Sequence, residues 1–372
     1  NAMLVFLDGR LNVVGRTQEN FGREFLELYT IGKGPQIGPE DYTNYTEQDV
    51  QQAARVLTGY VNDENFLNID PDTQIRAGYL RGNGLTAGQH DAEPKVFSDK
   101  FGGAVIQPTE LIDGKATVEA TLDELDQLVT MIFDQPETAR HICRKLYRFF
   151  CYYKLTDEIE QDIIQPLADT FTANDYELEP VISQLLSSTH FFDEDNALTE
   201  DNVRGSLIKS PIELNAIAVN YFGLQLPAEE NTRYETTYRS GFLRFMDFQG
   251  MSLYDPPEVA GYPAYHQTPE YNRNWISANN LARRYQLADF LINGQNAGGD
   301  DLGTKLDIVG FVRDNVSDPY DATVIVKELV EDLLPEIITT EREEYYLRQI
   351  LLDNLSLTNW QIEWGVYISS GE

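Results

Sequence analysis

The chain has 372 residues, of which 42% are hydrophobic, so it is long and apolar enough to bury a sizeable core and is not a disordered protein. Its 28 Lys and Arg residues face 61 Asp and Glu residues, and the formal net charge is −33. An acidic surface of this kind repels phosphate backbones and anionic lipids, which argues against nucleic acid as a partner, and no apolar run reaches the roughly 18 residues of a membrane span.

The first predicted element is a helix over "TQENFGREFLELYTIG", residues 17–32. At about 100° per residue, Asn20, Glu24 and Glu27 form a polar stripe beside the apolar face of this helix. A carboxylate beside an apolar face needs a partner, because an unpaired buried charge costs several kcal/mol, roughly. We therefore expect the acids of this helix to point inward and to meet basic groups.

A second helix is predicted after Thr46, because Thr46 and Asp49 have the spacing of a capping box. The following segment, residues 60–119, is rich in Gly, Asn and Asp and contains short apolar pieces. This pattern predicts a loop-rich insert that carries one or two short β-hairpins.

The insert contains "GQHDAEPK", which places His90 next to Asp91 with Lys95 close by. A histidine beside an acid in an irregular segment is a candidate general base or metal ligand. The alternative is a structural role in which the side chains only form hydrogen bonds inside the protein.

Two further helices are predicted after the insert. Thr121 and Glu124 have capping-box spacing ahead of "LDQLVTMIF", and Pro136 begins the next helix. Helical periodicity with start signals then continues to about residue 353. We predict a mainly α protein, a multi-helix globular bundle, with a single domain over residues 1–372.

The helix that begins at Pro136 carries an unusual concentration of base for so acidic a chain, including Arg144, Lys145 and Arg148. One interpretation is that this face forms salt bridges to acidic helices. The other is that Arg144 and Arg148 bind an anionic ligand with bidentate geometry.

Two features of the second half are also candidates. Residues 250–275 are rich in Pro and Tyr, which excludes a continuous helix and predicts either an ordered loop closed over the core or an aromatic platform for sugar or peptide. Lys209 precedes Ser210 and Pro211, which begin a helix, and its ammonium is a candidate partner for a neighbouring acid.

Several of these blocks occur together, in order, over about residues 4–284: "TQENFGREFLELYTIG", "YTEQDVQQAARVLTGY", "ARHICRKLYRFF", "IKSPIE" and "GMSLYDPPEVAGYP". In this the chain resembles the DUF1800 family of bacterial proteins. The matching positions are Asp8, Asn20, Arg23, Glu24, Glu27, Gly32, His90, Asp91, Arg144, Lys145, Arg148, Lys209, Pro256, Pro257 and Gly261. The chain departs from the family at Gly22, Met251 and Tyr262.

The resemblance implies a helical protein that is periplasmic or secreted, with a possible partner in the sulfatase-like DUF1501 family. It also implies that the N-terminal part of the family domain is missing, so that the chain would be the C-terminal part of a longer domain. The family carries no settled activity.

These observations leave three hypotheses. The first is a partner-dependent protein of the bacterial envelope that acts with the sulfatase-like protein, in which the stripe of the first helix, the arginine face and His90 with Asp91 form one polar network. The second is a hydrolase or metal-dependent enzyme acting on an anionic or carbohydrate substrate. Its candidate catalytic residues are His90, Asp91 and Glu24, and its candidate ligand-binding residues are Asn20, Glu27, Arg144, Lys145, Arg148 and Lys209. The third is a structural scaffold stabilised by a divalent metal such as Ca²⁺.

Overall fold

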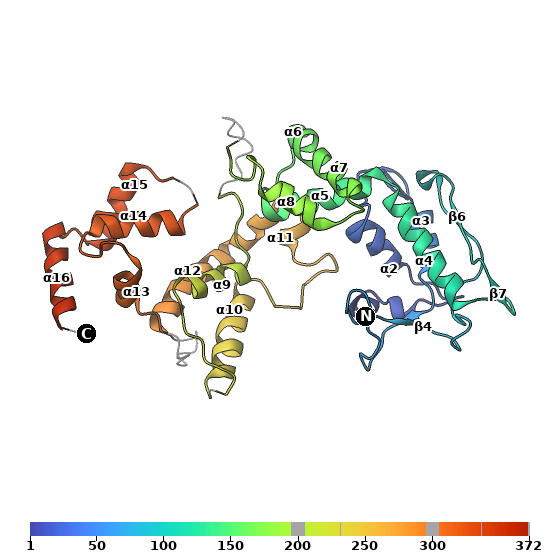
Figure 1. Ribbon diagram of the computed structural model, residues 1–372, viewed down its shortest axis with the longest axis horizontal. Helices are drawn as coiled ribbons and strands as arrows, with labels where there is room; N and C mark the ends of the chain where they lie inside the picture. The colour runs from blue at the N-terminus through green and yellow to red at the C-terminus, as the bar shows by residue number, and fades with distance from the viewer. Residues whose placement is uncertain (195–204, 231, 295–304, 336, 371–372) are drawn as a thin grey trace. The chain divides into compact units, whose positions relative to one another are not determined.

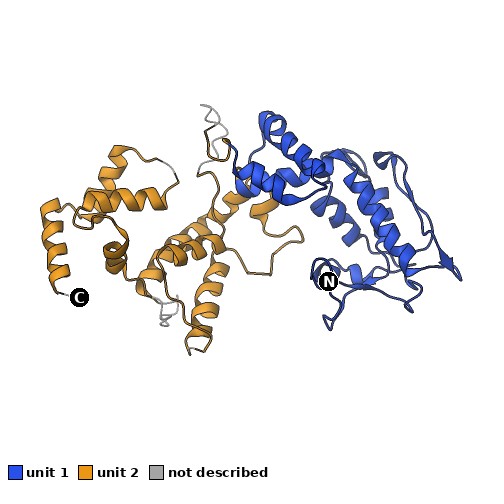
Figure 2. Cartoon of the chain, viewed as in Figure 1, with its two compact units in different colours: residues 1–150, 154–188 blue, residues 151–153, 189–372 orange. Residues whose placement is uncertain are grey.

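The computed structural model describes residues 1–372 except 195–204, 231, 295–304, 336 and 371–372 (Figure 1). The chain divides into two compact units, residues 1–150 with 154–188, and residues 151–153 with 189–372 (Figure 2). Helices dominate and the described strands form only two-stranded sheets, which confirms a mainly α protein with short β-hairpins. A single domain over the whole chain stays a prediction. Among the described helices, none is both long and apolar enough to cross a membrane.

The first unit begins with short helical elements: α1 (Ala2–Phe6), η1 (Gly9–Leu11), α2 (Glu19–Glu24), η2 (Phe25–Tyr29) and α3 (Glu47–Val56). The predicted first helix is therefore α2 continued by the π-helical turn η2. Helix α2 packs closely on α3, since a Cβ on Gly22 would lie 2.9 Å from the backbone nitrogen of Ala54. The capping box of Thr46 and Asp49 at the start of α3 is confirmed.

Residues 60–119 are loops joined by short antiparallel pairs: β3 (Tyr60–Val61) with β4 (Tyr79–Leu80), β5 (Lys95–Val96) with β6 (Val105–Ile106), and β7 (Leu111–Ile112) with β8 (Lys115–Ala116). A further pair, β1 (Gln36–Gly38) with β2 (Asp41–Tyr42), precedes α3. Phe97, Phe101 and Ile106 of the insert join the core cluster that also holds Val50 of α3 and Leu128 of the following helix. The core thus anchors the insert to both helices.

That following helix is α4 (Val118–Phe133), and the prediction that Thr121 and Glu124 cap its start is wrong. The N-cap is Thr117, whose hydroxyl accepts a hydrogen bond from the backbone N–H of Ala120 at 3.1 Å. Thr121 and Glu124 lie inside the helix and are fully buried. Thr121 and Glu124 lie on the helix face that also carries Leu128, and this face is buried. The helix therefore begins earlier than the local capping pattern predicts.

Helix α5 (Pro136–Phe150) begins at Pro136 as predicted. The first unit then ends with α6 (Asp157–Ile159), η4 (Glu160–Ile164), α7 (Gln165–Ala173) and α8 (Leu178–Leu186). Helix α5 buries Cys143 and Tyr147 and turns its basic residues outward from that face.

The second unit is almost entirely helical. Its elements are α9 (Pro211–Tyr221), η5 (Thr236–Leu243), α10 (Arg244–Phe248), α11 (Pro263–His266), η6 (Tyr271–Ile276), α12 (Ala278–Asn293), α13 (Ile308–Asn315), α14 (Ala322–Leu333), α15 (Thr340–Tyr345), η7 (Tyr346–Leu351) and α16 (Leu357–Ser370). The Pro- and Tyr-rich segment packs through Met251, Tyr262 and Trp275, whereas Tyr254 is 93% exposed. The short helix α11 and most of η6 lie within this segment, and Tyr265 is 44% exposed.

Candidate functional site

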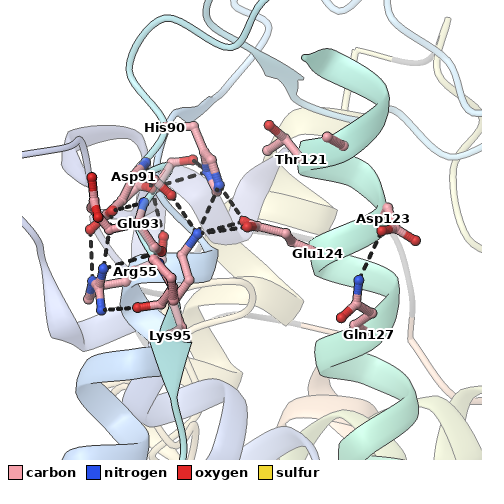
Figure 3. A network of polar contacts seen from close by, with 12 residues as sticks. Arg55, His90, Asp91, Glu93, Lys95, Thr121, Asp123, Glu124 and Gln127 are labelled. Carbon is pink, nitrogen blue, oxygen red and sulfur yellow. Dashed lines mark hydrogen bonds and ion pairs between the residues drawn. The ribbon is translucent and has the colours of Figure 1, made fainter. Parts of the chain in front are cut away.

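A buried polar centre lies where the insert meets α4 (Figure 3). His90 comes from the loop before β5, Lys95 is the first residue of β5, and Glu124 projects from α4. All three side chains are 0% exposed. Three ionisable groups are therefore enclosed together, and their charges have only one another and nearby dipoles as partners.

The Glu124 carboxylate accepts from both basic groups. Its Oε2 lies 2.5 Å from Nε2 of His90 and 2.7 Å from Nζ of Lys95, and its Oε1 lies 2.9 Å from the same Nζ. The ammonium also donates to the backbone carbonyl of Asp91 at 2.5 Å. Burial lowers the pKa of Lys95, and the hydrogen bond and charge of Glu124 oppose that shift. Every proton of the ammonium has an acceptor inside the protein.

Proton positions on His90 follow from its neighbours. Its Nδ1 lies 3.0 Å from the backbone carbonyl of Thr58, which can only accept, so Nδ1 carries a proton. The Thr58 hydroxyl donates to the carbonyl of Arg55 at 2.7 Å and accepts from the N–H of Asp91 at 2.8 Å. Nε2 lies within hydrogen-bonding distance of Oε2 of Glu124 and 3.4 Å from Nζ of Lys95. The three side chains therefore form one connected polar group.

A second ion pair supports the same loop. Arg55 on α3 donates from Nε to Oδ2 of Asp91 at 2.7 Å and from Nη2 to Oδ1 at 3.2 Å. Burial acts to raise the pKa of Asp91, but the Arg55 hydrogen bond and the N–H of Glu93 outweigh it and the pKa is lowered. Arg55 also donates to the carbonyl of Pro94 at 3.0 Å. The pair fastens the loop of residues 90–95 to α3.

Four members of this centre are absent from the catalytic and ligand-binding residues predicted from the sequence: Glu124, Arg55, Thr58 and Lys95, of which Lys95 was noted only as close to His90. A signal for Glu124 is present in the sequence, since it shares one face of α4 with Leu128 and Ile132, both buried. Like the acids of the first helix, Glu124 is a carboxylate in line with apolar residues at helical spacing, so it could have been predicted from the sequence. No comparable sequence signal marks Arg55 or Thr58.

The acids of the first helix lie elsewhere in the first unit. Glu27 accepts from the Tyr45 hydroxyl at 3.1 Å and has Lys33 at 3.8 Å. Glu24 is half-buried, and its carboxylate has no hydrogen bond or ion pair among the residues that the structure describes; burial and then the charge of Glu27 raise its pKa. Asn20 is likewise half-buried, without a side-chain hydrogen bond in the described part of the chain.

The basic face of α5 meets η2, but not through those acids. Arg144 pairs with Glu137 at 2.5 Å and Glu160 at 2.7 Å, as the salt-bridge interpretation expects. Lys145 donates to the backbone carbonyl of Leu28 at 2.6 Å. Arg148, one turn further along α5, is half-buried.

The structure therefore brings together His90 and Asp91 with Lys95, and separately places α5 against η2. It does not link Glu24 or Glu27 to Arg144 by any hydrogen bond or ion pair. Lys209 belongs to the second unit, where it is exposed and its carbonyl accepts from Arg284 at 2.8 Å. Within the described residues, no three His, Cys, Asp or Glu side chains are placed to hold a metal ion.

Comparison with known proteins gives one family. The family model described as DUF1800, protein of unknown function, matches residues 1–357. No curated protein and no solved structure matches the chain. The match extends beyond the motif blocks and includes every residue of the polar centre.

Proposed function

Because the chain belongs to DUF1800, a family of proteins of unknown function, we propose its role from the polar centre rather than from a characterised relative. The protein is a non-catalytic, partner-dependent protein of the bacterial envelope, and the centre of His90, Lys95 and Glu124 holds the insert in the shape that binds the partner. The candidate partner is the sulfatase-like DUF1501 family, which the resemblance implies.

The observation that carries this proposal is the complete burial of the centre. A general base must come within hydrogen-bonding distance of the proton that it removes, about 3 Å. His90, Lys95 and Glu124 are each 0% exposed at the side chain, and their polar atoms contact one another and backbone carbonyls. A centre that is closed to substrate is better suited to holding the insert in one conformation than to catalysing a reaction.

The centre is suited to fixing one arrangement of the insert. Buried ion pairs are weak sources of net stability, because removing the charges from water costs about as much as their attraction returns. Their value is that a displaced member leaves an unpaired buried charge. One carboxylate on α4 that binds two basic groups of the loop tolerates few alternative positions of that loop.

The enzymatic alternative requires His90 and Glu24 to reach a common point. In the structure His90 is bound to Glu124, while Asp91 is bound to Arg55. The Ca²⁺ scaffold alternative lacks support from a carboxylate cluster among the residues described. The binding role is therefore the better supported of the three.

Titration calorimetry against the purified sulfatase-like protein tests the proposal. We expect a complex with a Kd of about 1 μM or tighter, which corresponds to about 8 kcal/mol of binding free energy. His90→Gln, measured at a temperature where circular dichroism shows it folded, should weaken binding by about tenfold, because the centre that holds the insert in its binding shape has lost a member. Asp126→Ala, at an exposed position of α4, is the control and should bind within about twofold of the wild type.

Two results would overturn the proposal. One is the absence of binding heat at high concentrations of both proteins. The other is hydrolysis of a sulfate ester, phosphate ester or glycoside by the chain alone, with turnover abolished in folded His90→Gln.

A further inference from the structure

The hairpin formed by β3 and β4 presents apolar side chains to solvent. Leu67 is 80% exposed and Ile75 is 66% exposed, and about half of each of the neighbouring side chains Phe66, Ile69 and Tyr79 is exposed. These five residues, here called the hairpin patch, lie within fourteen positions of one another. Exposed apolar side chains gathered on one hairpin are typical of interaction surfaces.

Hydrogen bonds between the Asp63 carboxylate and backbone N–H groups hold the hairpin patch in place. The Asp63 carboxylate accepts from the N–H groups of Asn65, Leu67 and Asn68 at 3.0, 2.6 and 2.7 Å. These backbone hydrogen bonds lower the pKa of Asp63. Asn68 in turn donates from its side chain to the carbonyl of Gly78 at 2.6 Å, across the hairpin. The apolar side chains are therefore displayed on an ordered support.

The base of the hairpin is equally fixed. A Cβ on Gly78 would lie 2.4 Å from Cδ1 of Leu4 and 2.6 Å from the carbonyl oxygen of Val61. Gly78 thus packs closely against Leu4 of α1 and Val61 of β3, and there is no room for a side chain at this position. A surface that is already ordered loses little conformational entropy when it binds.

The charge around the patch limits the occupant. Besides the buried Asp63, residues 60–80 contain three acids, Glu64, Asp70 and Asp72, against the single base Arg76, whose guanidinium lies 5.3 Å from the centre of the Phe66 ring. A second copy would bring another formal charge of −33, and anionic lipid would also be repelled. Complementarity instead favours a surface with positive charge around an apolar centre.

We infer that the hairpin patch docks on a partner protein that presents an apolar patch rimmed by Lys and Arg. This inference rests on the proposed partner-dependent function and assigns its binding surface to the insert. Leu67 and Ile75 supply the apolar contacts, and the surrounding acids set the orientation and the association rate.

A defined peptide provides the probe. We would measure fluorescence anisotropy of a helical peptide with Leu on one face and Lys on the other, and of a matched peptide with Glu in place of Lys. The wild-type chain should bind the Leu/Lys peptide and not the Leu/Glu peptide. The double variant Leu67→Asp with Ile75→Asp should weaken binding by about tenfold or more, because it removes two central apolar contacts.

The direction of this change separates docking from non-specific attraction. Each Asp adds a negative charge, so a purely electrostatic complex with the Lys peptide would tighten in the double variant. The matched control is Leu85→Asp with Leu111→Asp, which makes the same change at two other exposed leucines of the insert and should leave binding within about twofold. Thermal unfolding of both variants should match the wild type, since all four side chains are exposed.

The inference is overturned if the double variant binds the peptide as tightly as the wild type, or if the control pair weakens binding equally. It is also overturned if sedimentation shows a dimer of this chain that Leu67→Asp with Ile75→Asp dissociates. If the sulfatase-like protein binds the wild type and the double variant equally, the patch assignment fails while the proposed function stands.

Discussion

Two histidines of the first unit, the buried His90 and the half-buried His141, differ in how their ring nitrogens are bonded. His90 has a carbonyl on Nδ1 and a carboxylate on Nε2, so both nitrogens are bonded. His141 lies on α5 beside Gly32, and its buried Nε2 has no hydrogen-bond partner in the described part of the chain. Burial lowers the pKa of His141 to about 4, assisted by the charges of Lys145, Arg144 and Arg148.

The contrast separates two ways of holding a loop against a helix. At His90 the loop is held by paired charges, so the loss of one partner exposes the others to an apolar interior. At His141 the loop is held by steric fit between a ring and a glycine, and a positive charge on the ring is opposed. The stability of the region around His90 should therefore fall when one of its charged side chains is removed. The stability of the region around His141 should fall when a larger side chain replaces Gly32 or when the pH is lowered.

The largest expected effect is at Glu124. Glu124→Ala leaves the Lys95 ammonium and His90 buried without their carboxylate, and breaking a buried pair in this way costs about 3–5 kcal/mol of unfolding free energy. Urea denaturation measures the loss. Asp126→Ala, at an exposed position two residues further along α4, is the control and should cost less than about 0.5 kcal/mol.

The same site offers a rescue experiment. Lys95→Met combined with Glu124→Leu removes both charges, so the double variant should be more stable than Glu124→Ala alone. A double variant that is as unstable as the sum of its single changes would show that the two side chains are not energetically coupled.

The next effect tests the steric contact at His141. Gly32 has φ of +73°, and a Cβ there would lie 2.4 Å from Nδ1 of His141. Gly84 has φ of +84° with nothing within 4 Å of its Cβ position. Both Gly→Ala changes should lower the unfolding free energy by about 1–2 kcal/mol, because alanine is strained in the left-handed region. Gly32→Ala should lower it by about 1–3 kcal/mol more, because the new methyl group overpacks against His141. Equal losses in the two variants would contradict the contact.

Acid should destabilise the His141 region. The unfolded imidazole has a pKa of about 6.5, while the folded value is about 4, so the unfolded state binds the proton more readily. The stability from the neutral ring is complete above pH 6.5, roughly, and is lost as the pH falls toward 4, by about 2 kcal/mol after solvent screening. The stability difference between wild type and His141→Gln, measured in urea at pH 7.5 and 4.5, isolates this group from the many carboxylates.

The smallest effect is at Arg144. Its ion pairs with Glu137 and Glu160 are partly exposed, so Arg144→Gln should cost no more than about 1 kcal/mol at pH 7. Loss of its charge should also raise the pKa of His141, which NMR titration of the ring proton would detect. A large loss of stability without movement of that pKa would place Arg144 in a role other than the one described.

How far the sequence could predict these regions depends on the range of the interactions. The Thr46 and Asp49 box is local, three residues apart, and it is found where predicted. Thr121 and Glu124 fit the same pattern, yet Thr117 caps α4 because the helix face that carries Glu124 is buried in the core. Local spacing could not reveal this, since it depends on how α4 packs.

The polar centre illustrates the same limit. His90 and Asp91 are adjacent in sequence and were chosen for that reason, but His90 contacts Glu124, 34 positions away, and Asp91 contacts Arg55, 36 positions away. The sequence could therefore identify His90 and Asp91 as candidates, but their partners could be found only from the three-dimensional structure. The predicted link between Glu27 and Arg144 is not found, because each side chain is paired with another residue: Glu27 with Tyr45, and Arg144 with Glu137.

Lysine acylation with acetic anhydride, read by peptide mass spectrometry, shows whether the centre of His90, Lys95 and Glu124 is sealed. The Lys95 side chain is 0% exposed, whereas Lys115 on β8 is exposed. Native protein should therefore be labelled at Lys115 but not at Lys95, and Lys95 should become labelled only after unfolding in urea. Labelling of Lys95 in the native protein at the rate of Lys115 would contradict a sealed centre, because a reachable amine of lowered pKa would belong to an open, reactive site.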